Sequence, residues 1–100
     1  MESSSWSYAA GRVNVLAVFD TDMFQGSTPA VGSWQVKHDG VVNAVVANNW
    51  VGPRSLLLVG TPGAQPGVNV TLELLVADAN LKDTGNVVIE PFGPVVVTPP

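Results

Sequence analysis

Valine supplies 19 of the 100 residues of this chain, and no other property narrows its folding options as strongly. Because valine carries two heavy atoms on Cβ, its first side-chain torsion is restricted, and it packs better on a pleated sheet than in a helix. The valines occur in short runs separated by glycine and proline, which are typical of turns. The sequence therefore favours an all-β protein.

Two segments show the alternation expected of buried strands. In residues 13–19 one face is apolar and the other is nearly so, which is typical of a strand covered on both sides. The first face holds Val13, Val15, Ala17 and Phe19, and the second holds Asn14, Leu16 and Val18. In residues 68–77 the side chains expected to point inward are Val68, Val70, Leu72, Leu74 and Val76. Leu75 interrupts the polar face of that strand and is therefore a candidate contact on the exterior.

The pair Asp39-Gly40 lies between two apolar segments, residues 32–38 and 41–47. This arrangement predicts a β-hairpin with a type I′ turn, because that turn needs positive φ at both central residues. The second segment, which we expect to end at Asn48-Asn49, also fits a helix with Val41, Val42, Val45, Val46 and Trp50 on one face. Four valines and the preceding turn favour the strand.

Further short strands are expected at residues 54–59, 87–90 and 95–98, with turns or loops at 52–53, 60–67 and 91–94. The chain thus has seven or eight short strands at intervals of about 8–12 residues, which predicts an antiparallel β-sandwich or a jelly-roll-like barrel. We assign residues 12–98 to a single β-sandwich domain, residues 1–11 to an N-terminal arm, and residues 99–100 to an extended tail.

The N-terminal arm is serine-rich but contains Trp6 and Tyr8. Large aromatic residues are uncommon in disordered leaders. Two interpretations are open: the arm is a first strand that packs on its own core, or it anchors to a neighbouring subunit.

Charge is scarce, with 12 charged residues in the chain against about 25% in ordinary soluble domains. The four basic residues are scattered, which argues against nucleic-acid binding. The longest apolar runs have four to five residues, far fewer than the about 20 needed to span a bilayer. An exterior with so little charge indicates a surface that other molecules cover.

The candidate chemical motifs are weak. Asp20-Thr-Asp22 has two carboxylates that could bind a divalent cation, and Asp78-Ala-Asn80 with Asp83 begins like a calcium loop but lacks its later ligands. His38 is the only histidine, and its position beside a turn predicts exposure to solvent. We therefore predict no catalytic residues, no metal site and no cofactor.

In its general layout the chain resembles the decoration (cement) proteins of tailed-phage capsids. The features that carry the resemblance are a small cysteine-free β-domain with few charges, Trp6 and Tyr8 in the arm, and a C-terminal segment, residues 95–100, that ends in two prolines. The resemblance implies a non-catalytic trimer that clamps major capsid protein subunits on the virion surface after synthesis in the host cytoplasm. The candidate interface residues are Trp6, Tyr8, Leu16, Val18, Trp50, Leu75 and Phe92.

The alternative is a carbohydrate-binding β-sandwich module. Such modules stack sugar rings on exposed tryptophans, and Trp34 and Trp50, with Asp20 or Asp22, would form that surface here. This hypothesis predicts an exposed aromatic platform and a monomer.

Overall fold

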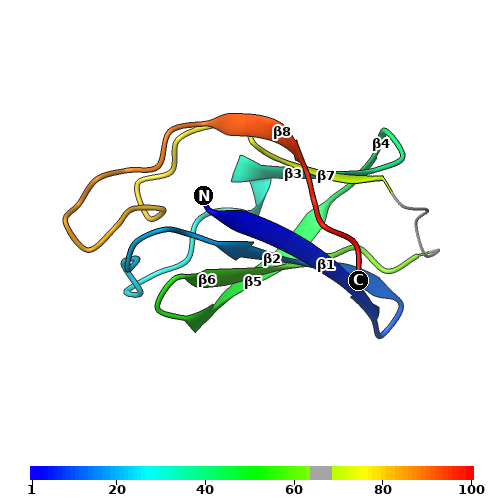
Figure 1. Ribbon diagram of the computed structural model, residues 1–100, viewed down its shortest axis with the longest axis horizontal. Coiled ribbons are helices and arrows are strands. Elements are labelled where there is room, and N and C mark those ends of the chain that lie inside the picture. Colours follow the sequence, from blue (N-terminus) through cyan, green and yellow to red (C-terminus); the bar gives the residue numbers. More distant parts are fainter. Residues whose placement is uncertain (64–68) are drawn as a thin grey trace.

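The computed structural model, which describes residues 1–63 and 69–100, consists of two four-stranded antiparallel sheets packed face to face (Figure 1). This confirms the predicted β-sandwich. The first sheet has the order β1 (Ser3–Ala9), β2 (Arg12–Val18), β6 (Ser55–Gly60) and β5 (Val45–Gly52). The second has the order β4 (Val41–Asn43), β3 (Trp34–His38), β7 (Val70–Leu74) and β8 (Phe92–Val96). A 3-10 turn, η1 (Val31–Ser33), precedes β3, and in the described part of the chain no helix is long and apolar enough to cross a membrane.

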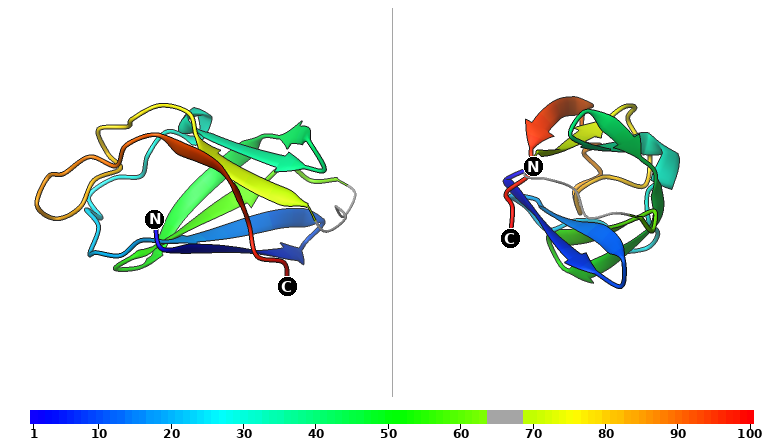
Figure 2. Two further views of the ribbon diagram at one scale, coloured as in Figure 1. Left: turned by 45° about the horizontal axis from the view of Figure 1, so that its top comes forward. Right: turned by 90° about the vertical axis from the view of Figure 1, so that its right-hand side faces the viewer.

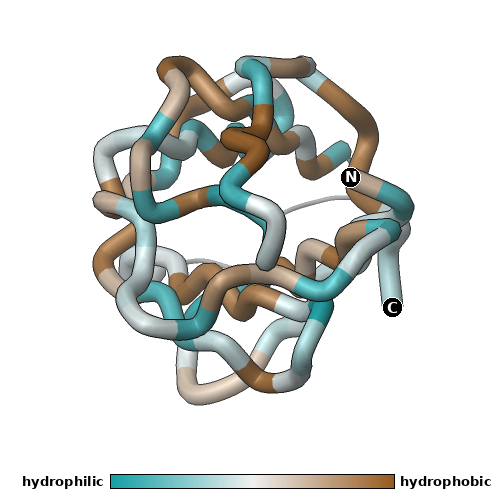
Figure 3. Tube along the Cα trace, turned by 90° about the vertical axis from the view of Figure 1, so that its left-hand side faces the viewer, coloured by the Kyte–Doolittle hydropathy of each residue, from teal (hydrophilic) through white to brown (hydrophobic). Residues whose placement is uncertain are grey.

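The core lies between the sheets and is built from alternate residues of each strand. In β2 the buried positions are Val13, Val15 and Ala17, as the alternation predicts, and Phe19 is buried just after the strand. Seen from the end that carries the long loops, hydrophobic and hydrophilic residues alternate along the chain in both layers (Figure 3). The largest side chains buried between the sheets include Leu56 and Leu58 of β6 and Leu72 and Leu74 of β7.

The N-terminal segment belongs to the sandwich of its own chain. Strand β1 pairs along its whole length with β2, from Ser3 opposite Val18 to Ala9 opposite Arg12. Trp6 faces inward and is buried in the core. Of the two interpretations of the arm, the structure therefore shows the one in which it forms a first strand.

The predicted hairpin turn at Asp39-Gly40 is confirmed, with φ of 52° and 84° at the two residues. The segment that follows differs from the expectation, because the chain leaves the second sheet after Asn43 and enters the first at Val45. It is neither one strand of residues 41–47 nor a helix. Strand β5 also continues through Asn48-Asn49, where we expected it to end. Asn48 can face inward because its amide donates a hydrogen bond of 2.8 Å to the Pro29 carbonyl.

The expected strand of residues 68–77 is shorter than the alternation indicates. Val70, Leu72 and Leu74 are buried as predicted, whereas Val76 is exposed. The N–H of Leu75 still donates to the Ser33 carbonyl, in register with the pairing of β3 and β7, but Ser33 belongs to η1, so no strand lies alongside the chain beyond this bond. Val68, the first residue of the expected strand, lies outside the described residues.

The C-terminal strands were predicted with the wrong bounds. Residues 87–90 are not a strand and make only an isolated bridge between Val88 and Lys82. Phe92, Gly93 and Pro94, expected in a connection, instead begin β8. Local pattern misplaced them because tertiary pairing with β7, such as Phe92 opposite Leu74, holds this segment in the sheet.

After β8 the chain crosses from the second sheet to the first and closes that side of the sandwich (Figures 1 and 2). Val97 is buried, and its N–H donates to the carbonyl of Val70. Thr98 lies beside β1, where its N–H donates to Ser4 and its carbonyl accepts from Trp6. The expected strand of residues 95–98 is therefore divided between β8 and this crossing segment.

Leu72→Ala should lower the free energy of unfolding by about 2–5 kcal/mol, because it removes buried methyl groups and leaves a cavity. Val96→Ala is the matched control, since Val96 is on the adjacent strand but 77% exposed, and should change stability by about 0.5 kcal/mol or less. Urea unfolding of both variants checks this. Equal losses would contradict the assignment of the core.

Candidate interaction surfaces

The outer face of the first sheet carries no charged side chain in its three central cross-strand rows. Because the inner positions of β1, β2 and β6 are buried, the alternate residues point outward. The rows are Ser3, Val18, Ser55 and Gly52; Ser5, Leu16, Leu57 and Asn49; and Ser7, Asn14, Val59 and Ala47. We call these twelve residues the serine–leucine face. Its centre is a half-buried apolar strip, and its margins are small or amide side chains.

The outer face of the second sheet is different, because it carries charge at its centre. Lys37 of β3 and Glu73 of β7 lie on that face, next to Thr71 and Gln35 respectively. Only the second sheet therefore has the usual amphipathic pattern, with an apolar inner face and a charged outer face. Charged side chains keep a sheet face in water and away from neighbours. The serine–leucine face lacks this protection.

The structure brings together some of the predicted interface residues and separates the others. Leu16 and Val18 both lie on the serine–leucine face. Leu75 is exposed where the chain leaves β7. Phe92 is half-buried at the other edge of the second sheet, with its ring 6.1 Å from that of Trp34.

The remaining predicted aromatic residues serve the fold of this chain. Trp6 is in the core and cannot anchor another subunit while β1 stays in its sheet. Tyr8 is partly exposed, and its hydroxyl donates a hydrogen bond of 2.8 Å to the Gly63 carbonyl. Trp50 is half-buried, packs 6.3 Å from Phe19 between ring centroids, and donates from Nε1 to the Ser27 carbonyl.

Sequence reasoning missed Leu57 and Val59, which share the face with Leu16. The signal was present in residues 56–59, four consecutive apolar residues whose odd members cannot point into the same core as the even ones. The N-terminal segment carries a similar signal, because Ser3, Ser5 and Ser7 alternate with Ser4 and Trp6 and must therefore point to the other face of a strand.

The two tryptophans of the carbohydrate hypothesis do not form an exposed pair. Trp34 is 4% exposed and contributes to the core, so its ring face is not open to a sugar. Trp50 is on the inner side of β5, held by its contacts with Phe19 and Ser27. The aromatic platform on which that hypothesis depends is absent from this arrangement of the two rings.

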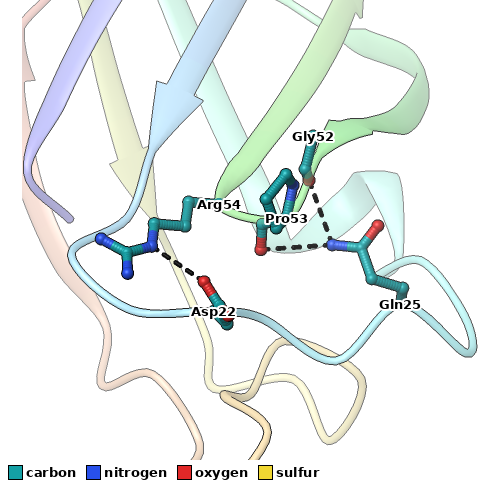
Figure 4. Close-up of polar contacts among 5 residues, drawn as sticks. All are labelled: Asp22, Gln25, Gly52, Pro53 and Arg54. Atoms are coloured by element: carbon teal, nitrogen blue, oxygen red, sulfur yellow. Dashed lines mark hydrogen bonds and ion pairs between the residues drawn. The ribbon is translucent and has the colours of Figure 1, made fainter.

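In the segment Asp20-Thr-Asp22, the carboxylate of Asp22 holds a loop in place by binding an arginine side chain (Figure 4). The Asp22 carboxylate accepts a hydrogen bond of 2.9 Å from Nε of Arg54, in the β5–β6 turn. In the same loop, the Gln25 amide donates to the carbonyls of Gly52 and Pro53. Within residues 1–63 and 69–100, no group of three or more histidine or acidic side chains is placed to hold a metal ion.

Asp78 organises the neighbouring loop, at the same end of the sandwich (Figure 1), through hydrogen bonds to its carboxylate. Burial raises its pKa, but N–H groups of Ala30 and Asn80 donate to the carboxylate at 2.8 and 2.9 Å. The Ser33 hydroxyl donates as well, at 3.1 Å. Together these bonds hold the pKa of Asp78 below its ordinary value of 3.8. Asp83 caps its own turn by accepting from the N–H groups of Gly85 and Val87.

A shallow groove of about 340 Å³ opens between the edge of β1 and the edge of β8. It is lined by Met1, Glu2, Ser3, Ser4, Val95, Val96 and Thr98. Glu2 supplies the one acidic side chain in this lining. The groove therefore offers one carboxylate and three hydroxyls.

His38 is less exposed than its place beside the turn predicts. It is half-buried, and its Nε2 is buried with no hydrogen-bond partner among the described residues. Burial lowers the pKa of His38 below 6.5, and the neighbouring carboxylate of Asp39 only partly opposes this. Charging the ring in the folded protein is therefore unfavourable.

Comparison of the chain with family models, with curated proteins and with solved structures finds no significant match. Its function is therefore argued from the surfaces described above.

The low pKa of His38 predicts that the protein loses stability as pH falls through 6.5, the value for an unfolded histidine, towards the lower folded value. In that window the unfolded chain binds a proton that the folded chain resists. Unfolding free energies measured by urea one pH unit above and one below 6.5 check this. His38→Gln should remove the histidine part of the difference, and an unchanged pH dependence in that variant would refute the prediction.

Proposed function

We propose that this protein is a non-catalytic structural component whose serine–leucine face is covered by a partner protein in a larger assembly. The observation that carries the proposal is the absence of charge from the twelve residues of that face. The centres of stable protein interfaces are depleted in charged residues in the same way. The small residues along β1, such as Ser5 and Ser7, let another surface approach the apolar strip closely.

In its specific form, the proposal is that the assembly is a virus capsid and that this chain decorates the shell formed by the major capsid protein. The small size of the domain and its uncharged face support a cement role, because a cement protein acts by adding contact area between neighbouring subunits. Leu16 and Val18, already predicted as interface residues, lie at the centre of the face. Trp6 no longer supports this role, since it is in the core.

The proposal predicts that a lysine placed at the centre of the face blocks assembly. In Leu57→Lys an ammonium group without a partner would be buried against the partner protein, at a cost of about 1.4 kcal/mol or more, which is about tenfold in affinity. The control is Gln35→Lys, which adds the same charge to the outer face of the other sheet, opposite Glu73.

The measurement is the amount of each tagged protein that enters virions or the native particle, purified by density-gradient sedimentation. We expect the unmodified protein and Gln35→Lys in the particle fraction, with at least tenfold less Leu57→Lys. Circular dichroism verifies that the variants are folded. Equal incorporation of Leu57→Lys would overturn the role of the face, and absence of all three proteins from particles would overturn the proposed function.

A further inference from the structure

The four edge strands of the sandwich are protected to very different degrees. An exposed edge offers unpaired backbone N–H and C=O groups to any other strand, and proteins block it with short strands, prolines, charges or covering segments. The edge of β1 is covered by the crossing segment at Thr98. Strand β8 contains Pro94, which has no N–H to donate, and β4 has only three residues. Strand β5 has eight residues without proline or charge.

The outer edge of β5 is unpaired in the part of the chain that the structure describes. Its one sheet partner is β6, and from Val45 to Val51 the backbone makes no hydrogen bond to another described segment. The strand has irregularities near both ends, between Val45 and Ala47 and between Trp50 and Gly52. Between them, residues 47–50 are regular and can pair with a further strand.

The two strands on the side of the sandwich that contains this edge, β4 and β5, carry no charged residue. Strands β1 and β8 lie together on the opposite side, so β5 shares its side with β4, to which it is joined through Ala44. The 3-10 turn η1 lies against β5 on the same side. No charged residue occurs from Gly40 to Pro53. We call the exposed valines here the valine wall: Val31, Val41, Val42, Val46 and Val51.

We propose that the free edge of β5 pairs antiparallel with β5 of a second copy of this protein, across a two-fold axis at Asn49. The inference rests on the proposed assembly function and names one of its contacts. Paired residues must lie on the same face of the joined sheet, so the axis has to pass through a residue position rather than between two. Asn49 is in the regular part, is exposed, and points outward. The two Asn49 amides can then donate to and accept from each other.

A second copy suits this edge better than an unrelated strand does. In a two-fold antiparallel pair the residue on the axis meets its own copy, and the residues beside it meet one another, so a charge at the centre of the strand would oppose a like charge. The segment from Gly40 to Pro53 avoids that repulsion entirely. The pair also joins the two serine–leucine faces into one continuous eight-stranded surface.

The size of the wall is on the scale that a stable dimer needs. Eight residues of strand extend over about 27 Å, and the sandwich is 20 to 23 Å across its two shorter axes. The side of the sandwich that carries the wall thus has a projected area of about 540 Å². Specific interfaces bury about 800 Å² on each partner.

This contact predicts a dimer rather than the trimer that the capsid resemblance implies. A closed trimer needs a heterologous contact, in which the β5 edge meets a different edge of the next subunit. The other three edges are covered, interrupted by proline, or short. The two-fold pairing is therefore the one that this set of edges favours.

A cysteine at the axis tests the pairing directly. The chain contains no cysteine, so Asn49→Cys introduces a single thiol. Opposite residues of an antiparallel pair have Cα atoms about 4.5–5.5 Å apart, within the range that a disulfide bridges. We expect Asn49→Cys to form a covalent dimer under mild oxidation, seen on a non-reducing gel. Ser5→Cys, also exposed on the first sheet but at its opposite edge, should stay monomeric on the gel.

Light scattering of the purified protein provides the second test. The unmodified protein and Leu57→Lys should be dimers, because the face of Leu57 is not used in this contact. Asn49→Lys should raise the dimer dissociation constant at least tenfold, because it places two ammonium groups opposite each other. A monomer, a trimer, a dimer that Leu57→Lys dissociates, or a dimer that Asn49→Lys leaves intact would overturn the pairing. If such a protein still entered particles in a Leu57-dependent way, the proposed function would stand without it.

Discussion

The packing of two apolar inner rows against each other holds this protein together. Leu56 and Leu58 of one sheet and Leu72 and Leu74 of the other are almost wholly removed from water. Each fully buried side chain of this kind stabilises the fold by about 1.5–3 kcal/mol relative to an exposed one. Because no disulfide is present, the sandwich depends on this burial and on the backbone hydrogen bonds of its sheets.

Filling the core from alternate residues leaves the other alternate residues on the outside, and here those are unusual. A chain with few charged residues cannot supply charge to every face. Most of its acidic side chains lie in loops, where Asp22 binds Arg54 and Asp78 binds backbone N–H groups. The first sheet is therefore left with serine, asparagine, valine and leucine outside. The proposed function follows from that distribution of charge, not from any single residue.

The edges of the sheets divide the molecule in a second way. On one side, the crossing segment at Val97 and Thr98 joins β8 to β1 and occupies backbone groups of both sheets. On the other side, η1 and the loop before it lie against β5 and accept side-chain hydrogen bonds from Asn48 and Trp50, but no described segment pairs with the outer backbone edge of β5. Backbone hydrogen bonds thus close the side of β1 and β8, whereas the backbone edge of β5 has no described partner. A further strand can be added at the β5 edge, which suits the proposed two-fold contact between copies.

Local pattern predicted those elements in which neighbouring residues suffice. Alternation in residues 13–19 identified the inner face of β2, and the backbone demands of a type I′ turn identified Asp39-Gly40. Pattern failed where distant segments compete for the chain. Phe92 is in a strand because of its pairing with Leu74. Val76 is exposed because β3 begins only at Trp34, so the pairing of β7 with its neighbour ends at the bond between Leu75 and Ser33.

The candidate surfaces divide in the same manner. Composition alone indicated that part of the exterior is to be covered, and Leu16 and Val18 were identified from the sequence because both faces of their strand are apolar. Leu57 and Val59 complete the same surface because of the strand order β1-β2-β6-β5, which brings together residues about forty positions apart in the sequence. The sequence specified which strands have two apolar faces, through alternation, which is local. Strand order decided which of those faces adjoin, and the path of the C-terminal segment decided which edge stays unpaired. Strand order and this path both arise from contacts between distant parts of the chain.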